Sequence, residues 1–499
     1  MTIAPVLPHD AVSLRCDLTQ PWEVEAELLV VVAPAPAAEA PAWLAEYAEH
    51  IEALEPGEQL TIHRTALSAF RATIVEIVAL EGQVPDAVRR AGRSVGAQRR
   101  SVTRVAVTGL DAEGADSPAI AFVRGFAEGR YRFTRYRGSG AIAPAELVIA
   151  GAASANLEAL GRELAESQIV EASVSWCRDL VNVPARDLTP AAFADEAVLE
   201  AQRSGATVRV YDEAWLIAER FAGLVSVGDG SPNPPRLVEL TYRGTAAAET
   251  PPIVLVGKGV TFDSGGLSLK KASAMMEMKS DMAGAATVAA AVTAIARLAP
   301  ERAHVVALLA LAENMPGPDA LRPGDIIRHR NGVTTEVVNT DCEGRLVMSD
   351  VLAWAAERSP AAIVDVATLT YSTIAALGME ITSVLGNDPA LIGAIRRAGD
   401  LTGDPYWELP LWGPYRRYID SPFADLRNEE TGDGAGAITA ALFLREFVGS
   451  TPWAHLDTGG TAYLDEETDD LEAGATGTCV RSLIRLVLDQ QCTTNGGVS

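Results

Sequence analysis

The sequence predicts an α/β protein of two domains: a larger C-terminal domain with a mixed, largely parallel sheet covered by helices, and a smaller N-terminal α/β domain before it. The length of 499 residues exceeds what one hydrophobic core usually holds. Hydrophobic residues make up 48% of the chain, enough to bury a large interior. Beyond residue 184, apolar segments alternate with helical ones, as in sheets of parallel strands. We place the N-terminal domain at 1–160, a linking helix at 161–184 and the C-terminal domain at 185–499.

The N-terminal domain combines short β-like runs with alanine-rich helical patterns. The runs lie at residues 28–32, 72–78, 104–108 and 146–149. No cluster of catalytic residue types accompanies them in the sequence. Residues 156–180 then follow one uninterrupted helical pattern, which we expect to join the two domains.

The C-terminal domain has a different pattern, in which apolar strands and helices take turns. We expect strands at 253–256, 305–309 and 362–367. We expect helices at 284–298, 344–358 and 437–448. Active sites in such folds lie beyond the carboxyl ends of the strands, and the polar residues discussed below follow strands in this way.

Charge and composition exclude several classes of function. A net charge of −25 disfavours a general binder of polyanions, because phosphate contacts need clustered cations. Arginine-rich stretches at 89–104 and 124–137 are interpreted as solvated helix faces or subunit contacts, so nucleic acid is not an expected partner. The N-terminus has no signal pattern and no run of about 18 apolar residues follows, so we expect a cytoplasmic protein without a membrane segment. Five widely spaced cysteines without a CxxC pair predict reduced thiols.

The four lysines of the chain, Lys258, Lys270, Lys271 and Lys279, all lie within one stretch of 22 residues, while the other basic residues are arginines. Arginine can replace lysine as a surface charge, but it cannot lose its proton or ligate a metal as a neutral amine. The clustering therefore indicates a chemical role for this segment. A lysine-poor composition that left a local remnant is the alternative interpretation.

Lys258 follows directly after an expected buried strand, where a charged side chain is costly unless another group offsets it. A metal ion that accepts a neutral amine would do so and would depress the lysine pKa. A phosphate-binding loop is the rival interpretation, but the GxxxxGK[ST] spacing is absent.

Four acidic residues occur in the neighbouring polar segments. Asp263 follows the same strand, and Asp281 precedes a helix of small residues, where an ordinary helix cap is the alternative. Asp341 and Glu343 lie two positions apart in an expected extended segment, so both carboxylates face one point. Gathered together, the four would repel one another strongly unless divalent cations lay among them.

Histidine is absent from these segments, and none of the six histidines belongs to an HExxH motif. His455 is interpreted as a core or strand-end residue. The predicted ligand set is therefore oxygen-rich with one lysine nitrogen, which suits Zn²⁺, Mn²⁺, Co²⁺ or Mg²⁺ without choosing among them. Cys342 is interpreted as a small apolar filler, because a nucleophile would need a nearby base.

The motifs resemble those of the leucyl aminopeptidase family, the cytosol aminopeptidases, which are dinuclear-metal exopeptidases. The family string NTDAEGRL appears here as NTDCEGRL at 339–346, and VGKGVTFDSGG, MKSDMAGAA, AENMP and RPGD accompany it. The resemblance runs from about residue 178 to 483 and does not include the first 160 residues. It implies a hydrolase that releases N-terminal amino acids from peptides with a free N-terminus.

The resemblance also implies which residues bind two divalent cations per chain. Lys258, Asp263, Asp281 and Glu343 correspond to the ligands of one metal, and Asp263, Asp341 and Glu343 to those of the other. Manganese or zinc is the expected ion, with magnesium or cobalt as the alternative. A hydroxide activated by the two ions would attack the first peptide carbonyl.

Two further residues take catalytic roles by the same resemblance. Lys270 would polarise the substrate carbonyl and stabilise the tetrahedral intermediate. Arg345 would hold a bicarbonate that serves as general base, and its place at a helix N-terminus suits an anion. Members of the family assemble as homohexamers, so the resemblance implies a hexamer.

The pocket for the first side chain of the substrate would be lined by Met278, Thr368, Leu369, Tyr371 and Gly459. Two of these depart from the family pattern, with tyrosine at 371 where glycine is usual and glycine at 459 where alanine is usual. We expect a reshaped pocket, so a preference for leucine does not follow from the resemblance. For Met278, a plain core position is an equal interpretation.

Two alternatives come from other classes of protein. The first is a non-catalytic binding or regulatory protein on the same fold, which would contact DNA through the N-terminal arginines. The second is a metallophosphatase, which also uses two ions but does not explain a lysine ligand.

Overall fold

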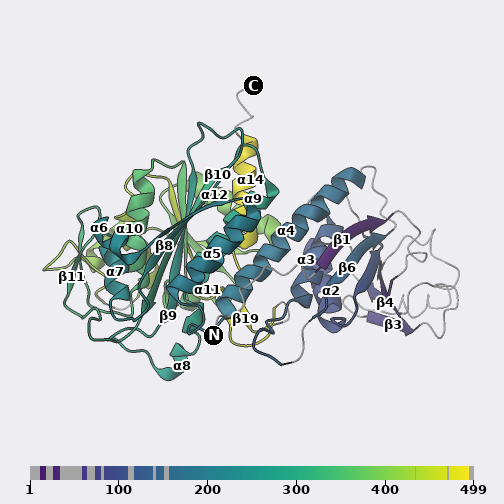
Figure 1. The fold of residues 1–499 in the computed structure, drawn as a ribbon, viewed down its shortest axis with the longest axis horizontal. Helices are drawn as coiled ribbons and strands as arrows, with labels where there is room; N and C mark the ends of the chain where they lie inside the picture. The colour runs from purple at the N-terminus through teal and green to yellow at the C-terminus, as the bar shows by residue number, and fades with distance from the viewer. Residues whose placement is uncertain are drawn as a thin grey trace. The chain divides into compact units, whose positions relative to one another are not determined.

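A computed structural model gives the architecture of the chain (Figure 1). The structure describes residues 12–17, 26–33, 59–63, 74–79, 84–110, 117–138, 142–150, 157–432, 434–468 and 471–493. Two compact units divide the chain, one formed by Pro8–Ala172 with a short return segment and the other mainly by Ser173–Thr468 and Glu472–Ser499. The domain boundaries at residues 160 and 184 stay predictions.

The smaller unit contains a six-stranded sheet in the order β1-β6-β5-β2-β4-β3. All neighbouring strands are parallel except β3 and β4. The strands are β1 (Val12–Asp17), β2 (Leu28–Ala33), β3 (Gln59–His63), β4 (Ile74–Ala79), β5 (Arg104–Thr108) and β6 (Ala145–Ala150), and the helices are α2 (Pro85–Gln98) and α3 (Pro118–Arg130). Four expected strands therefore exist, although residues 72 and 73 of one prediction lie outside the described residues.

Several arginines of this unit are bound within it. Arg89 forms an ion pair with Glu128 at 2.8 Å, and Arg104 forms one with Glu146 at 2.7 Å. The buried guanidinium of Arg130 donates to backbone carbonyls of neighbouring loops. These arginines hold the unit together, since their charges are directed at partners in the same unit.

The larger unit is built on an eight-stranded mixed sheet in the order β15-β14-β17-β13-β9-β10-β8-β7. Its strands are β7 (Thr207–Tyr211), β8 (Arg236–Arg243), β9 (Ile253–Asp263), β10 (His304–Asn314), β13 (Ala362–Ala367), β14 (Thr382–Gly386), β15 (Tyr406–Glu408) and β17 (Trp453–Asp457). Smaller sheets consist of β11 (Ile326–Arg328), β12 (Thr334–Glu336) and β16 (Leu426–Arg427), and of β18 (Tyr463–Leu464) and β19 (Gly474–Ala475). The central strands β10, β9, β13 and β17 run parallel to their neighbours in this group.

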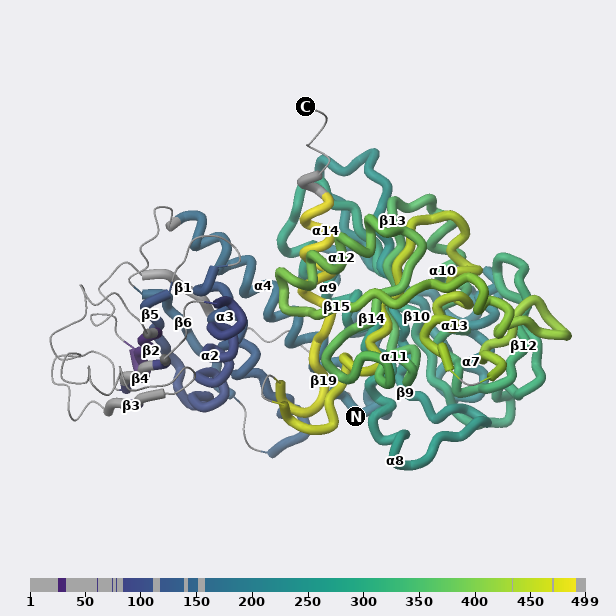
Figure 2. The backbone as a smooth tube through the Cα atoms, turned by 180° about the vertical axis from the view of Figure 1, so that it is seen from behind, coloured from purple at the N-terminus to yellow at the C-terminus, as the bar shows by residue number. Residues whose placement is uncertain are grey.

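Helices cover both faces of this sheet. Figures 1 and 2 show α9, α12 and α14 over one face and α7, α10 and α13 over the other. The helices are α4 (Leu157–Asn182), whose residues up to Ala172 belong to the smaller unit, α5 (Pro190–Ser204), α6 (Glu213–Ala218), α7 (Ala222–Gly228), α8 (Ala272–Met275), η4 (Met278–Ser280), α9 (Ala283–Leu298), α10 (Gly344–Glu357), α11 (Tyr371–Leu377), α12 (Pro389–Thr402), η5 (Gly413–Ile419), α13 (Gly436–Arg445) and α14 (Val480–Thr493). The predicted fold class is confirmed.

Strand β9 is longer than the sequence predicts. It continues through Gly257 and Lys258 to Asp263, so the lysine lies within the strand and not beyond its end. A Cβ atom on Gly257 would come within 2.5 Å of Ala285 Cα, so only glycine lets α9 pack this closely on the strand. Gly257 and Gly259, which in the sequence suggest a loop around the lysine, therefore lie in a buried strand where neighbouring atoms pack closely.

Among the described residues, one helical segment is apolar and long enough to span a membrane by length and composition alone. It covers Met278–Leu298, and 89% of its most apolar window is buried inside the protein. Its alanines pack against β8, β9 and β10. Cys177, Cys342 and Cys479 are free thiols, and the side chains of Cys16 and Cys492 lie outside the described residues.

A buried histidine–aspartate pair joins two neighbouring strands of the large sheet. His455 on β17 faces Asp365 on β13, with Nδ1 and Oδ1 2.6 Å apart, and both side chains are fully buried. The Trp453 indole donates to the other carboxylate oxygen at 2.6 Å. Burial lowers the pKa of His455, but the Asp365 carboxylate outweighs burial and raises this pKa above its ordinary value. The interpretation of His455 as a core residue is confirmed.

This pair gives the unfolding free energy a pH dependence. A raised folded-state pKa means that the stabilisation is complete below about pH 6.5 and is lost as the pH rises through the folded-state value. We expect His455→Gln to lower the free energy of unfolding by about 2–4 kcal/mol at pH 6, and by less at pH 9. Denaturant unfolding at both pH values measures the difference, with His304→Gln at the start of β10 as the control. An equal loss at the two pH values would contradict a charged histidine.

Candidate metal centre and active site

The site lies at one edge of the large sheet, where four parallel strands end. Asp263 closes β9, Asn314 closes β10, Thr368 follows β13 and Asp457 closes β17. Parallel strands bring their carboxyl ends to the same edge, which explains why residues so distant in sequence meet here.

The loop after β9 folds back on the strand that precedes it. Gly265 has a φ of +84°, a left-handed conformation that favours glycine, and it begins the turn. The Lys270 backbone N–H donates to the Ser264 carbonyl at 2.9 Å and closes the loop. Thr340 ties this loop to the NTDCEGRL segment, because its hydroxyl donates to the Gly265 carbonyl at 2.7 Å. The loop thereby places Lys270 beside Asp263.

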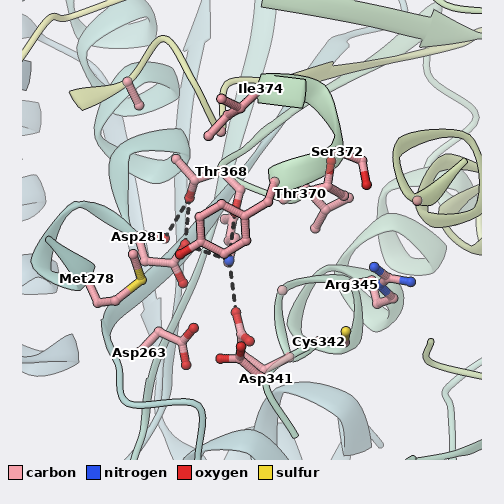
Figure 3. A pocket seen from close by; sticks show the side chains of 18 of the residues that line it. Asp263, Met278, Asp281, Asp341, Cys342, Arg345, Thr368, Thr370, Ser372 and Ile374 are labelled. Atoms are coloured by element: carbon pink, nitrogen blue, oxygen red, sulfur yellow. Dashed lines mark hydrogen bonds and ion pairs between the residues drawn. The ribbon is translucent and has the colours of Figure 1, made fainter. Parts of the chain in front are cut away.

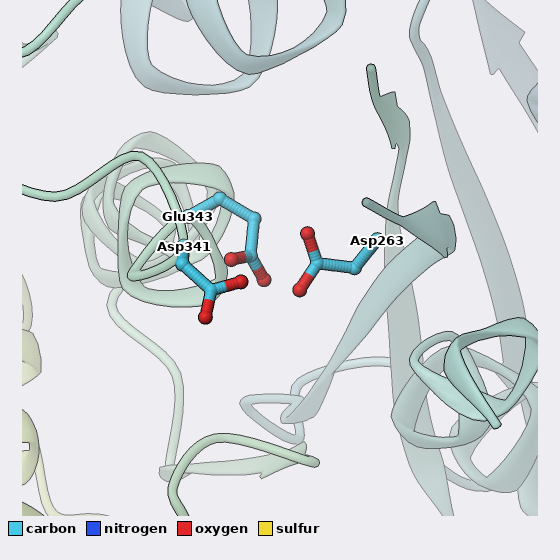
Figure 4. A group of neighbouring side chains, drawn as sticks. All are labelled: Asp263, Asp341 and Glu343. Carbon is cyan, nitrogen blue, oxygen red and sulfur yellow. The ribbon is translucent and has the colours of Figure 1, made fainter. Parts of the chain in front are cut away.

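The segment with Asp341 and Glu343 differs from the prediction. It is a turn and not an extended segment, since the Cys342 N–H donates to the Asn339 carbonyl at 3.3 Å and Glu343 already has helical angles as the residue before α10. The side chains still converge. Carboxylate oxygens of Asp263, Asp341 and Glu343 lie within 4.8 Å of one another, an arrangement that could hold a metal ion (Figure 4).

Lys258 stands among carboxylates in the interior. Its ammonium lies 2.7 Å from Asp281 Oδ1 and 2.9 Å from Glu343 Oε1, and it donates to the Thr368 carbonyl at 2.9 Å. Its side chain is 4% exposed, so water does little to screen these charges. Space is made by Gly344, because a Cβ atom there would lie 2.7 Å from Lys258 Cε. Asp281 therefore pairs with Lys258 and does not cap a helix.

The charges of this cluster shift one another's pKa values. Burial lowers the pKa of Lys258, but the Asp281, Glu343 and Asp263 carboxylates together raise it above its ordinary value. Burial raises the pKa of Asp263 to about 6, with Glu343 adding to the rise and the two lysines opposing it. Burial also raises the pKa of Asp281 well above its usual range. The cluster thus carries more negative charge than the surrounding protein groups readily stabilise.

Lys270 offsets charge on the other side of the cluster. Its ammonium lies 3.0 Å from Asp263 Oδ2 and 2.5 Å from Asp341 Oδ1. Burial lowers the pKa of Lys270, but the carboxylates of Asp263 and Glu343 raise it overall. The same ammonium lies 5.9 Å from the centre of the Tyr371 ring, within range of a cation–π contact.

The cluster passes a test of fit for metal ions. Asp281 Oδ2 and Glu343 Oε2 are buried and have no hydrogen-bond partner among the described residues. A buried carboxylate oxygen without a partner is costly, and a cation would satisfy it. Oxygen ligands with a single amine nitrogen suit the divalent ions named above.

Arg345 lies in the first turn of α10 with its side chain buried. Its Nε and Nη1 atoms have no hydrogen-bond partner in the part of the chain that the structure describes. Buried guanidinium donors beside the N-terminus of a helix form a place for an anion.

These residues open onto one pocket of about 310 Å³. Figure 3 shows Met278 on one side of Asp281 and Asp341, with Cys342, Arg345 and Ser372 on the other. The five residues that the sequence analysis assigns to the pocket all line it: Met278, Thr368, Leu369, Tyr371 and Gly459.

Tyr371 and Cys342 stand in different surroundings within the pocket. Tyr371 begins α11 and is 62% exposed. Burial raises the pKa of the Cys342 thiol to about 12, so this thiol is a poor nucleophile.

Three supporting groups escaped the sequence analysis. Asn314 donates to Asp263 Oδ1 at 2.8 Å and to the Thr340 carbonyl at 3.0 Å, which fixes the carboxylate. Asp457 accepts from the backbone N–H groups of Leu369 and Gly459, both at 3.1 Å, which shapes the pocket wall. The third is the Thr368 carbonyl that accepts from Lys258. Asn314 and Asp457 end parallel strands, and that position could have identified them.

Comparison with known proteins decides the family. The model of the catalytic domain of the cytosol aminopeptidase family matches residues 175–484. A probable cytosol aminopeptidase of Roseiflexus castenholzii is 44% identical over 381 residues, which is 75% of this chain and 77% of the relative. The chain belongs to the cytosol aminopeptidase family. A second probable cytosol aminopeptidase, from Geobacter sulfurreducens, is 41% identical over 84% of this chain and 85% of its own length.

Solved structures agree with this assignment. The bottromycin maturation enzyme BotP in complex with Mn superposes with a TM-score of 0.82 at 36% identity, over 93% of this chain and 99% of that one. A second structure of BotP gives a TM-score of 0.81 at 37% identity, over 94% of this chain and all of the other. The chain is therefore a metal-dependent hydrolase of the leucyl aminopeptidase type that acts on peptides.

A testable prediction follows from the close packing of Gly344 against Lys258. In Gly344→Ala the new methyl group must displace the lysine, and we expect a loss of about 1–3 kcal/mol in stability. A displacement of this kind should also lower kcat/KM for a leucyl reporter substrate by about 100-fold. The control is Gly413→Ala, whose methyl group meets no atom within 4 Å. Wild-type activity in Gly344→Ala would refute the close-packing argument.

Proposed function

We propose that this enzyme removes the first residue of peptides with the help of two divalent cations, manganese or zinc. Lys258, Asp263, Asp281 and Glu343 would hold one cation, and Asp263, Asp341 and Glu343 the other. The observation that carries the proposal is the buried group of carboxylates whose oxygens, on Asp281 and Glu343, lack hydrogen-bond partners among the described residues. The manganese complex of the related BotP supports it.

When bound, the two cations lower the pKa of water, so that a hydroxide nucleophile is available at neutral pH. Lys270 then acts on the substrate, because its ammonium can donate to the first carbonyl oxygen as negative charge develops there. To ligate a cation, Lys258 would give up its proton, and the Thr368 carbonyl would keep the amine in place.

Arg345 would position the base of the reaction. Its Nε and Nη1 donors, which have no hydrogen-bond partner among the described residues, would hold a bicarbonate, and this anion would supply a general base for the reaction. The helix N-terminus adds backbone donors to the same anion.

The first residue of the substrate would lie on the Met278 side of the cluster and the leaving peptide on the Cys342 side. At the Asp281 end of the cluster, carboxylates would face the N-terminus of a bound peptide. These groups favour a free amine over an internal peptide group. That preference accounts for removal of residues from the N-terminus without internal cleavage.

We also propose that the protein acts in the cytoplasm as a homohexamer, as members of the family do. The names of the related cytosol aminopeptidases support the location. Light scattering of the purified protein measures the number of chains, and a monomeric mass would refute the hexamer.

Removal of the lysine ligand tests the metal proposal. We expect two ions per wild-type chain, fewer in Lys258→Ala, and a loss of activity of at least about 100-fold, because even partners of metal ligands contribute 10- to 100-fold. Elemental analysis and hydrolysis of an aminoacyl reporter measure both. The control is Lys271→Ala, a neighbouring lysine that is exposed and does not line the pocket. Full metal content in Lys258→Ala would contradict the assigned ligand set.

A second experiment tests the pocket for the first side chain. Tyr371 adds a ring beside Lys270, so Tyr371→Gly should enlarge this part of the pocket. We expect kcat/KM ratios between large and small first residues to change by about tenfold. A panel of aminoacyl reporters measures the profile for both proteins. An unchanged profile would exclude Tyr371 as a determinant of side-chain preference.

A further inference from the structure

Besides Glu277, which precedes Met278 in the chain, two carboxylates of the pocket have no part in the proposed metal chemistry. Glu429 and Glu430 follow β16, are half-buried, and line the same pocket as the metal cluster. Neither forms an ion pair with a cationic side chain in the described part of the chain. Both carboxylates therefore remain available to a ligand in the pocket.

The two glutamates lie on the side proposed for the leaving peptide. Glu429 Oε1 accepts from Asn339 Nδ2 at 2.9 Å and lies 4.0 Å from Cys342 Sγ. Figure 3 shows Cys342, Arg345 and Ser372 on the side of Asp341 away from Met278.

Glu430 reaches the same side by a separate contact. A Cβ atom on Gly436 would lie 2.9 Å from Glu430 Oε1 and would also overlap the Ser372 hydroxyl. Glu430 and Ser372 therefore lie against the same glycine at the start of α13. Contacts from Cys342 and from Ser372 thus place the pair of glutamates in one half of the pocket.

We infer that Glu429 and Glu430 select substrates whose second residue is basic, an inference that rests on the proposed aminopeptidase function. Lysine and arginine side chains are long and flexible enough to reach the pocket wall from the backbone, and each offers several donors to a carboxylate. Half-buried carboxylates attract a cation more strongly than exposed ones, because less water screens the charges. An acidic second residue would be repelled by the same pair.

Arg345 does not cancel this effect. Its guanidinium lines the same pocket, but it forms no ion pair with either glutamate in the described structure, and its buried donors face the proposed anion. Glu429 also supports the NTDCEGRL turn through Asn339, so its substitution must keep an acceptor oxygen. Glutamine does so while it removes the charge.

Three leucyl dipeptide amides test the inference, because they keep the first residue constant and carry no terminal carboxylate. Leu-Lys-amide has a cationic second residue, Leu-norleucine-amide has a similar stem without the charge, and Leu-Glu-amide has an anionic one. With the metal-loaded full-length enzyme we expect kcat/KM for the lysine substrate to exceed that for norleucine by about tenfold, and the glutamate substrate to be the slowest. Added salt should reduce the lysine preference.

In the double variant Glu429→Gln and Glu430→Gln, the ratio of lysine to norleucine should fall to about one. Glu430→Gln alone should lower it part of the way, and this variant leaves the bond to Asn339 untouched. The matched control is Glu408→Gln, an exposed glutamate outside the pocket, which should keep the wild-type ratio. Metal content of each variant is measured so that ligand loss is recognised.

The outcomes separate the inference from the function on which it rests. A wild-type ratio near one, or a tenfold ratio retained by the double variant, overturns the role of the glutamates while the aminopeptidase function stands. Failure of the metal-loaded enzyme to hydrolyse any of the three amides overturns the proposed function and the inference with it.

Discussion

The structure of the site depends on the repulsion among four acidic side chains that the fold gathers at one sheet edge. At an effective dielectric constant near 20, two unit charges about 4 Å apart interact by about 4 kcal/mol, and the cluster contains several such pairs. Lys258 and Lys270 offset part of this energy, one on each side. Arginine could supply the charge but not a neutral amine, so the place of Lys258 in this cluster agrees with the proposed lysine ligand.

Neutral hydrogen bonds hold the charged groups in position. Asn314 and Thr340 connect the ends of β9 and β10 to the turn that carries Asp341. Asn428 donates to the Asn339 carbonyl at 2.6 Å and fixes that turn from the segment that follows β16. Because these partners carry no charge, they orient the carboxylates without reducing the negative charge that attracts a cation. The scaffold therefore prepares the site but leaves its charge available.

Sequence reasoning predicted the fold class and the identity of the charged residues, because both leave local signals. Apolar runs mark β9, β10 and β13, and the residue types of the site stand directly after them. It failed where the cause is a distant contact. Lys258 lies inside β9 because α9 packs on Gly257, and the turn at Asp341 depends on Asn428, nearly 90 positions away. Neither contact can be predicted from the spacing of residues within one segment.

The residues that form the charged cluster also differ in their structural position from the residues that line the pocket wall. The cluster of Lys258, Asp281 and Glu343 is buried among strand ends, so almost any substitution there disturbs the whole charge balance. Tyr371 and Glu430 belong to a helix start and a loop at the pocket wall, and Tyr371 is 62% exposed. Side chains in such positions can change without moving a strand. Variation at the pocket wall can therefore alter which peptides fit while the reaction at the sheet edge is retained. For this reason, a family resemblance that rests on the charged cluster does not imply a preference for leucine.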